Sequence, residues 1–129
     1  MTLPHDNVYA RLGPSEIAGI GVFAIVPIPE GTNIFANDRL DMIWVDEAEI
    51  AGLSDEVKRL YTDFGVARHG KLGVPKNFNL LTTGWYLNEP PADAPHNLGV
   101  TRDLGFVALR DIAPGEELTT RYSDYSENG

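Results

Sequence analysis

One pattern occurs twice in this sequence and constrains the fold more than any other feature. Residues 22–34 (VFAIVPIPEGTNI) can be laid over residues 106–118 (FVALRDIAPGEEL), with alanine, isoleucine and glycine at the same offsets in both copies. Each copy reads as an apolar strand, a proline-containing turn and a return to extended structure. Two copies are too few for a solenoid, which needs at least three stacked repeats. We therefore expect two similar hairpins in a mostly β fold.

The rest of the first quarter of the chain also predicts strands. Residues 8–12 (VYARL) read as a short strand that ends at the turn residues 13–15 (GPS). Residues 19–26 (GIGVFAIV) are apolar, rich in β-branched side chains and introduced by two glycines, which is typical of a buried strand. With 129 residues in all, we expect residues 1–129 to form a single domain.

Helix is predicted only between the two copies of the pattern, over about residues 46–64. Asp46 is followed three residues later by Glu49, which is the spacing of a capping box. Apolar side chains then recur at three- and four-residue spacing, so one or two short helices would pack on the sheets through Ile50, Leu53, Val57, Leu60, Tyr61 and Phe64. Farther on, residues 89–95 (EPPADAP) cannot form a regular element, because prolines fix the backbone and remove donors.

Charge and composition narrow the range of partners. The formal net charge of −9 does not suit direct binding to nucleic acid, which needs clustered Lys and Arg, whereas a cationic partner fits it. The chain has no cysteine and its three histidines lack metal-ligand spacing, so no metal site is expected. No signal peptide or stretch of about 18 apolar residues is present, so we expect a cytoplasmic protein that does not bind membranes.

Three separate segments, in the same order as in the family, resemble the SET domain. The first is residues 19–24 (GIGVFA), which is similar to the GxG segment near the N-terminus of SET domains. The resemblance implies that Gly19, Ile20 and Gly21 present main-chain groups to the methionine part of S-adenosylmethionine. Glycine suits this role because a side chain there would keep a ligand away from the backbone.

The second segment is residues 85–98, which resembles the aromatic, hydrophobic and Asn-His-Ser segment of the family and its downstream Pro-Asn. Asn88 falls on the asparagine that faces the cofactor, and Asn97 on the downstream asparagine. Glu89 and Pro90 stand where His and Ser are usual. The resemblance implies that Glu89 contributes main-chain groups to the adenine site. A proline-rich surface loop is the structural alternative.

The third segment, residues 106–125, contains the most specific match. Residues 117–122 (ELTTRY) are similar to the Glu-Leu-x-x-Asp-Tyr sequence that ends SET domains. Tyr122 falls on the catalytic tyrosine, which also borders the cofactor, while Arg121 replaces the usual aspartate. Tyr125 is the candidate to close the lysine channel, and Trp85 and Tyr86 are further candidates for its aromatic walls. The paired acids Glu116 and Glu117 read as a solvated edge without a chemical role.

These resemblances imply a fold and a reaction. The expected fold is the SET-domain β-clip of small sheets, with a C-terminal pseudoknot-like closure and one or two short helices. The expected activity is methyl transfer from S-adenosylmethionine to a lysine side chain of a protein or peptide, by a monomer or a homodimer. The alternative is a non-catalytic β-clip module, either a degenerate SET domain or a SAF-like domain, that binds a ligand or a protein.

Overall fold

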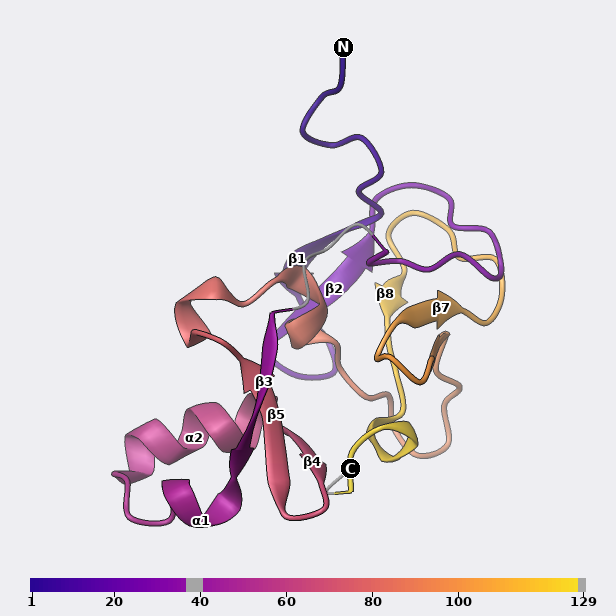
Figure 1. Ribbon diagram of the computed structural model, residues 1–129. Coiled ribbons are helices and arrows are strands. Elements are labelled where there is room, and N and C mark those ends of the chain that lie inside the picture. Colours follow the sequence, from indigo (N-terminus) through magenta and orange to yellow (C-terminus); the bar gives the residue numbers. More distant parts are fainter. Residues whose placement is uncertain (37–40, 128–129) are drawn as a thin grey trace.

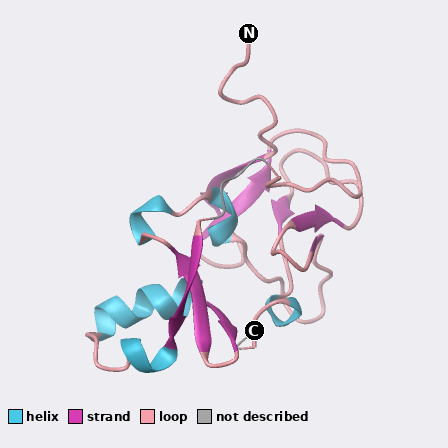
Figure 2. Ribbon diagram, in the orientation of Figure 1, coloured by secondary structure: helices cyan, strands magenta, loops and turns pink. Residues whose placement is uncertain are grey.

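The computed structural model describes residues 1–36 and 41–127 of the chain. Within these residues the strands form three small antiparallel sheets, accompanied by two α-helices and three short 3-10 helices (Figures 1 and 2). The predicted fold class, mostly β with one or two short helices, is confirmed. The described part of the chain contains no helix with both the length and the apolar character that crossing a membrane requires.

Two of the sheets are built from the first and last parts of the chain. In the three-stranded sheet β2 (Ile20–Ala24) lies between β1 (Ala10–Pro14) and β8 (Glu117–Leu118). The two-stranded sheet pairs β6 (Leu98–Val100) with β7 (Phe106–Ala108). Figure 1 shows β2 in the violet of the N-terminal region beside β8 in the yellow of the C-terminal region. Segments about ninety residues apart in the sequence therefore form one sheet.

The two copies of the repeated pattern pair with each other, and neither folds into a hairpin on its own. Their central isoleucines, Ile28 and Ile112, exchange both main-chain hydrogen bonds, at 2.8 and 2.9 Å. The turn glycine of each copy, Gly31 or Gly115, donates its amide to the alanine carbonyl of the other copy, at 2.8 Å in both cases. The expectation of two similar hairpins was wrong. Because the two strand-turn patterns are alike, each copy offers donors and acceptors at the positions that the other copy needs, and the hydrogen bonds form between the copies.

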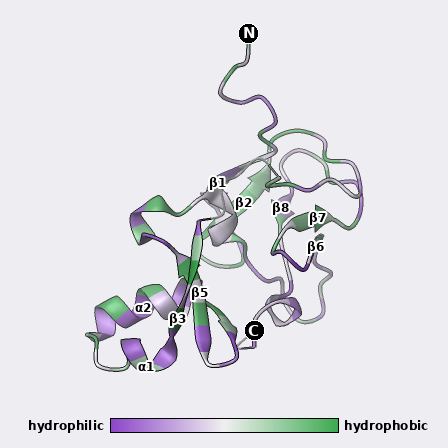
Figure 3. Ribbon diagram, viewed as in Figure 1, coloured by the Kyte–Doolittle hydropathy of each residue, from purple (hydrophilic) through white to green (hydrophobic). Residues whose placement is uncertain are grey.

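Apolar side chains of both copies form most of the main core. Figure 3 shows hydrophobic residues concentrated on β2 and on β7. Five of its members, Val22, Ile28, Leu98, Ile112 and Leu118, are among the largest side chains that are fully buried. The core is made of Ala10, Val22, Ala24, Ile28, Ile34, Leu87, Leu98, Ala108, Ile112 and Leu118.

The third sheet is formed by the middle of the chain. Its order is β3 (Met42–Asp46), β5 (Lys71–Pro75) and β4 (Val66–Arg68), and two helices lie beside it, α1 (Glu47–Ile50) and α2 (Asp55–Phe64) (Figure 1). The helical prediction for residues 46–64 is therefore right in position, although it is divided between two helices. The strand β3 before them was not expected from the sequence.

The helix ends differ from the predicted capping box. Asp46 is the N-cap residue of α1, but its side chain makes no capping hydrogen bond and lies 3.8 Å from the ammonium group of Lys71. Instead, Ser54 caps α2 by accepting a hydrogen bond from the amide of Val57. The spacing therefore located the helix start correctly, but the predicted capping box does not form, since the Asp46 side chain lies beside Lys71 and makes no cap hydrogen bond.

The predicted apolar stripe is only partly buried. Ile50 and Tyr61 pack against the small core of the third sheet. Leu53, Val57 and Leu60 remain 40%, 41% and 38% exposed. The sheet is only three strands wide, so it covers one side of the helices and leaves these three side chains in contact with solvent.

The C-terminal part of the chain closes the fold. Thr119 pairs in parallel with Asn88 and Thr120 with Leu98, so this stretch passes between two segments that precede it. A 3-10 helix, η3 (Tyr122–Asp124), follows at once. This arrangement is the predicted pseudoknot-like closure, and it places η3 next to the 85–98 segment.

The end of the described chain is fixed to the third sheet. The hydroxyl of Ser126 accepts a hydrogen bond from the amide of Ala67, and the amide of Glu127 donates to the carbonyl of Ala67 at 2.8 Å. The C-terminal segment therefore connects the sheet that contains β8 to the third sheet, which contains β4.

Candidate active site

Asn88 lies beneath the loop that precedes β2. Its side-chain nitrogen lies 3.0 Å from the carbonyl of Ala18, 3.2 Å from that of Ile20, 3.1 Å from Ser15 Oγ and 3.0 Å from Glu117 Oε2. Two of these acceptors belong to residues 18–21, which we call the glycine loop, and one to β8, so the asparagine connects the three segments that carry the predicted motifs. The sequence placed Asn88 and the glycine loop at one site, and the fold brings them into contact.

The two glycines of this loop serve different purposes. Gly19 has a φ of +43°, and the space around the position of a Cβ is free of atoms within 4 Å. A ligand can therefore approach the backbone from the side where a Cβ would lie, while the Gly19 carbonyl accepts a hydrogen bond from the amide of Ser15. At Gly21 a Cβ would collide with Glu117 Oε2. Gly19 thus leaves space for a ligand beside the backbone, and Gly21 leaves space for the carboxylate of Glu117.

Glu117 is a site residue that the sequence analysis missed. Its carboxylate accepts hydrogen bonds from Ser15 Oγ at 2.8 and 2.9 Å and from Asn88. The prediction of a solvated edge was wrong for this residue. Leu118 is fully buried on one face of β8, so the alternation of a strand directs Glu117 to the opposite face, beneath the glycine loop. That alternation was the signal available in the sequence. Its neighbour Glu116 binds Arg110 and the amide of Ala113.

Asn97, matched to the downstream asparagine of the family pattern, holds the strand that leads to the site. It is 4% exposed. Its side-chain nitrogen donates to the carbonyl of Glu117 at 2.9 Å, and its side-chain oxygen accepts from the amide of Thr119 at 2.8 Å. A buried asparagine that replaces strand hydrogen bonds in this way fixes the path of the chain toward Tyr122.

Tyr122 is tied to the 87–89 segment at two points. Its hydroxyl donates a hydrogen bond to the carbonyl of Leu87 at 2.8 Å, and its amide donates to Glu89 Oε1 at 2.9 Å. Burial, with a smaller contribution from the nearby charge of Glu89, raises the pKa of Tyr122 above its ordinary value. The hydroxyl is therefore protonated at neutral pH and acts as a hydrogen-bond donor.

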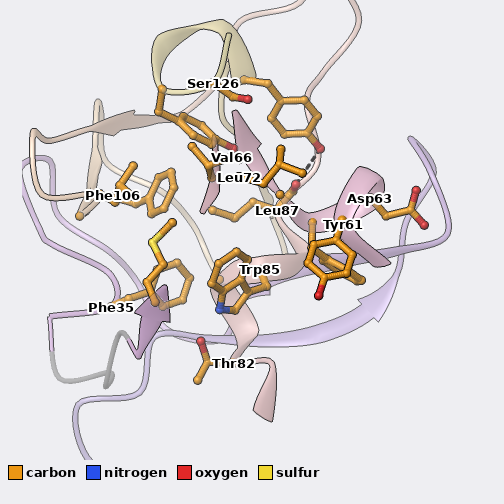
Figure 4. A pocket seen from close by; sticks show the side chains of 18 of the residues that line it. Phe35, Tyr61, Asp63, Val66, Leu72, Thr82, Trp85, Leu87, Phe106 and Ser126 are labelled. Atoms are coloured by element: carbon orange, nitrogen blue, oxygen red, sulfur yellow. Dashed lines mark hydrogen bonds between the residues drawn. The ribbon is translucent and has the colours of Figure 1, made fainter. Parts of the chain in front are cut away.

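A cavity of about 650 Å³ opens beside Tyr122. Three of the residues predicted for the catalytic group and the channel, Trp85, Tyr122 and Tyr125, line it. Figure 4 shows Trp85 between Phe35 and Tyr61, and it draws the hydrogen bond to Leu87 as a dashed line. The volume is within the range of small-molecule sites, which is roughly 300–1,000 Å³.

The chemical character of this cavity suits a cation. Its described lining contains the carboxylates Glu47, Asp63 and Asp103 and no Lys, Arg or His. Aromatic rings make up much of the remaining wall, and the faces of such rings attract cations.

Tyr125, the residue that the resemblance suggested for the channel, lines the cavity. Its ring is T-shaped to Phe106 at 5.6 Å and to Tyr122 at 6.2 Å. Burial raises the pKa of Tyr125 strongly. Arg68 donates a hydrogen bond to its carbonyl at 3.0 Å, so β4 positions this residue.

Tyr86 has a different position from its predicted one. It does not line the cavity but packs on the main core, with its ring T-shaped to Phe64 at 5.6 Å. It belongs to the 3-10 helix η2 (Thr83–Tyr86), in which consecutive residues point in different directions. This turn directs Trp85 into the cavity and Tyr86 away from it.

The predicted site residues thus form two groups that meet at one residue. Gly19, Ile20, Gly21, Asn88 and Glu89 do not line the cavity. Tyr122 contacts Glu89 through its main chain and lines the cavity with its side chain. The described residues contain no group of three or more His, Cys, Asp or Glu side chains that could hold a metal ion.

Comparisons with known proteins show the family and the fold of this chain. The SET domain family model matches residues 19–123. No curated protein sequence matches. Among solved structures, a crystal structure of a "putative histone methyltransferase" from Plasmodium falciparum is similar in fold, with a TM-score of 0.56 and 18% identity over 87% of this chain and 90% of that one. Because the family model covers most of the chain, including the glycine loop, Asn88 and Tyr122, the protein belongs to the SET-domain family.

Proposed function

We propose that this protein is an S-adenosylmethionine-dependent protein-lysine N-methyltransferase in which Tyr122 is the catalytic residue. The observation that carries the proposal is the position of Tyr122. It joins the group formed by the glycine loop, Asn88 and Glu89 to a cavity with aromatic and acidic walls. A methyltransferase needs this connection, because its donor and acceptor must meet at one point.

The residues around the glycine loop fit the cofactor. The main chain at Gly19 is open, and Asn88 fixes the carbonyls on either side of it. We assign Gly19, Ile20, Gly21, Asn88 and Glu89 to cofactor binding. S-adenosylmethionine would supply an electrophilic methyl group carried on a sulfonium.

The cavity fits the acceptor. An amine can attack only after it has lost its proton, and transfer from water into an apolar channel lowers the pKa of an ammonium group. The rings of Trp85 and Tyr125 would surround the alkyl chain, while the carboxylates at Glu47, Asp63 and Asp103 would attract the cationic peptide that carries it.

Positioning would provide most of the catalysis. Methyl transfer is an in-line displacement, so the enzyme must hold the nitrogen and the methyl carbon collinear. The protonated hydroxyl of Tyr122, held by Leu87, would direct its dipole at the reacting centre. No strong base is needed once the amine is neutral.

Isothermal titration with S-adenosylmethionine and S-adenosylhomocysteine, followed by transfer of a labelled methyl group to lysine-rich peptides, tests the proposal. Asn88→Ala should weaken cofactor binding. Tyr122→Phe should bind the cofactor normally but lower kcat by about 100-fold or more, because the hydroxyl oxygen that would orient the amine is lost and a misplaced reacting group costs about that much. Tyr9→Phe, which lies outside the site, is the matched control and should behave like the parent.

A non-catalytic β-clip module is the second candidate. One observation favours it: the side-chain nitrogen of Asn88 is already surrounded by four acceptors of the protein itself. If millimolar cofactor gave neither heat nor a thermal shift, the enzyme proposal would be rejected in favour of this module. The cytoplasmic location and the monomeric or homodimeric state remain predictions from the sequence.

A further inference from the structure

Glu89 and Arg121, which are far apart in the sequence, lie side by side next to Tyr122. Glu89 Oε1 is 3.9 Å from Arg121 Nη1, and their side chains are only 31% and 24% exposed. Both residues depart from the pattern described above, in which His and Asp are usual. The two residues that differ from the family pattern therefore carry opposite charges that face each other.

Arg121 also holds the proline-rich loop. Its Nη1 donates to the carbonyl of Pro90 at 3.2 Å, and its Nη2 donates to the carbonyl of Ala94 at 3.0 Å. Prolines contribute no amide to such a loop, so its carbonyls need donors from elsewhere. An aspartate at position 121 has no donor and would add a second negative charge beside Glu89. The guanidinium group donates to the two carbonyls and lies close enough to the Glu89 carboxylate for a charge interaction.

The Glu89 carboxylate connects Arg121 to Tyr122. The same Oε1 atom that faces Arg121 accepts the hydrogen bond of the Tyr122 amide at 2.9 Å. Tyr122 begins η3, where the amide has no partner within the helix. The hydroxyl at the other end of the residue is held by Leu87, two positions before Glu89. Both contacts of Tyr122 are therefore made to one short segment, and Arg121 fixes that segment.

We propose that Glu89 and Arg121 form a pair of positioning residues that set the orientation of Tyr122 for methyl transfer. This inference rests on the proposed function and extends it to two residues that do not touch the cavity. In this chain a charged pair, Glu89 and Arg121, stands where the family pattern has His and Asp. We expect each residue to orient Tyr122 only when the other is present.

The test uses substitutions that separate charge from hydrogen bonding. Glu89→Gln keeps an oxygen acceptor for the Tyr122 amide but loses the charge, whereas Glu89→Ala loses both. Arg121→Met keeps the alkyl stem and loses all donors, while Arg121→Lys keeps the charge without the planar fork. Arg110→Met is the control, because Arg110 pairs with Glu116 away from the site.

The first readout does not depend on activity. In protein labelled with ¹⁵N-tyrosine, the amide proton of Tyr122 is assigned from the signal that Tyr122→Phe removes. Glu89→Ala should move this resonance upfield, Glu89→Gln should largely retain it, and Arg110→Met should not affect it. An unmoved Tyr122 resonance in Glu89→Ala would overturn the proposal, even if the parent showed no methyl transfer at all.

The second readout is steady-state kinetics. Glu89→Ala and Arg121→Met should each lower kcat by about 10- to 100-fold, as a displacement of about 1 Å at the reacting group does. The KM for the cofactor should change little, because the role assigned to Glu89 in cofactor binding uses its main-chain groups, which alanine keeps. The double variant should lose no more than the worse single variant, because the two residues act as a unit. If Glu89→Ala or Arg121→Met does not fold, the kinetics of the conservative variants Glu89→Gln and Arg121→Lys provide the test. A kcat equal to that of Arg110→Met in every variant would overturn the proposal.

Discussion

Asn97→Ala should destabilise the protein more than any other single removal of a side-chain amide near the site. Asn97 is 4% exposed and makes two hydrogen bonds to the main chain, at 2.8 and 2.9 Å. Alanine would leave the amide of Thr119 without its acceptor and the carbonyl of Glu117 without this donor. Both groups lie where the chain passes between earlier segments, so solvent cannot readily replace the lost partners.

The expected cost can be worked out from these contacts. A buried main-chain group without a partner costs about 1–3 kcal/mol, so the two groups together give a loss of about 3 kcal/mol in the free energy of unfolding. At about 2.1 cal/mol/K per residue, the 129 residues correspond to an unfolding entropy of about 270 cal/mol/K. The melting temperature should therefore fall by about 11 °C.

Thermal unfolding followed by circular dichroism, together with urea titration, measures this loss. Asn79→Ala is the control, because Asn79 is exposed. It should change the melting temperature by no more than about 2 °C, as surface substitutions generally do. If Asn97→Ala lowered the melting temperature no further than this control, the proposed role of Asn97 in the closure of the chain would be refuted.

Three further predictions concern single side chains. The hydroxyl of Thr120 is buried and has no hydrogen-bond partner among the described residues, so Thr120→Val should raise the free energy of unfolding by about 1 kcal/mol in urea titrations, and a loss of stability would contradict this. A Cβ at Gly21 would displace Glu117, so Gly21→Ala should weaken cofactor binding by about tenfold or more in calorimetry, whereas Gly52→Ala, which meets nothing within 4 Å, should bind as the parent does. Burial raises the pKa values of Tyr122 and Tyr125, so the unfolded chain releases these protons at a lower pH than the folded protein. The free energy of unfolding should then be level below about pH 9 and fall above about pH 10, and urea titrations should show a smaller fall for Tyr125→Phe than for the parent.

Local sequence signals predicted the strands of the first and last parts of the chain and the two helices, but not the strands of the third sheet or the pairing partners. The strand preceded by two glycines, the helical stretch at 46–64 and the proline-rich loop are visible because they depend on periodicity and backbone restrictions. The pairing of the repeated patterns was not visible. A strand carries the same donors and acceptors whether it pairs with its neighbour or with a distant copy, so only the folded chain selects between them.

The same limit applies to the site. Asn88 and Tyr122 could be chosen from the sequence because they fall on ordered motifs, whereas Glu117 was read as a solvated edge. Strand alternation separates Glu117 from the buried Leu118, but only the folded chain places Ser15 and Asn88 on the side to which Glu117 points. Tyr86 likewise differs from its neighbour Trp85 only through the turn of η2.

The sequence by itself determined that this chain is mostly β, that it carries three ordered SET motifs and that Tyr122 ends the last of them. Only the tertiary structure decided that the two repeats interlock, that Glu117 and Asn88 lie beneath the glycine loop, and that Glu89 faces Arg121. The physical reason is that turn chemistry and strand patterning act over a few residues, whereas each of these contacts joins segments at least twenty-nine residues apart. Such contacts form only when the whole chain has closed around its core.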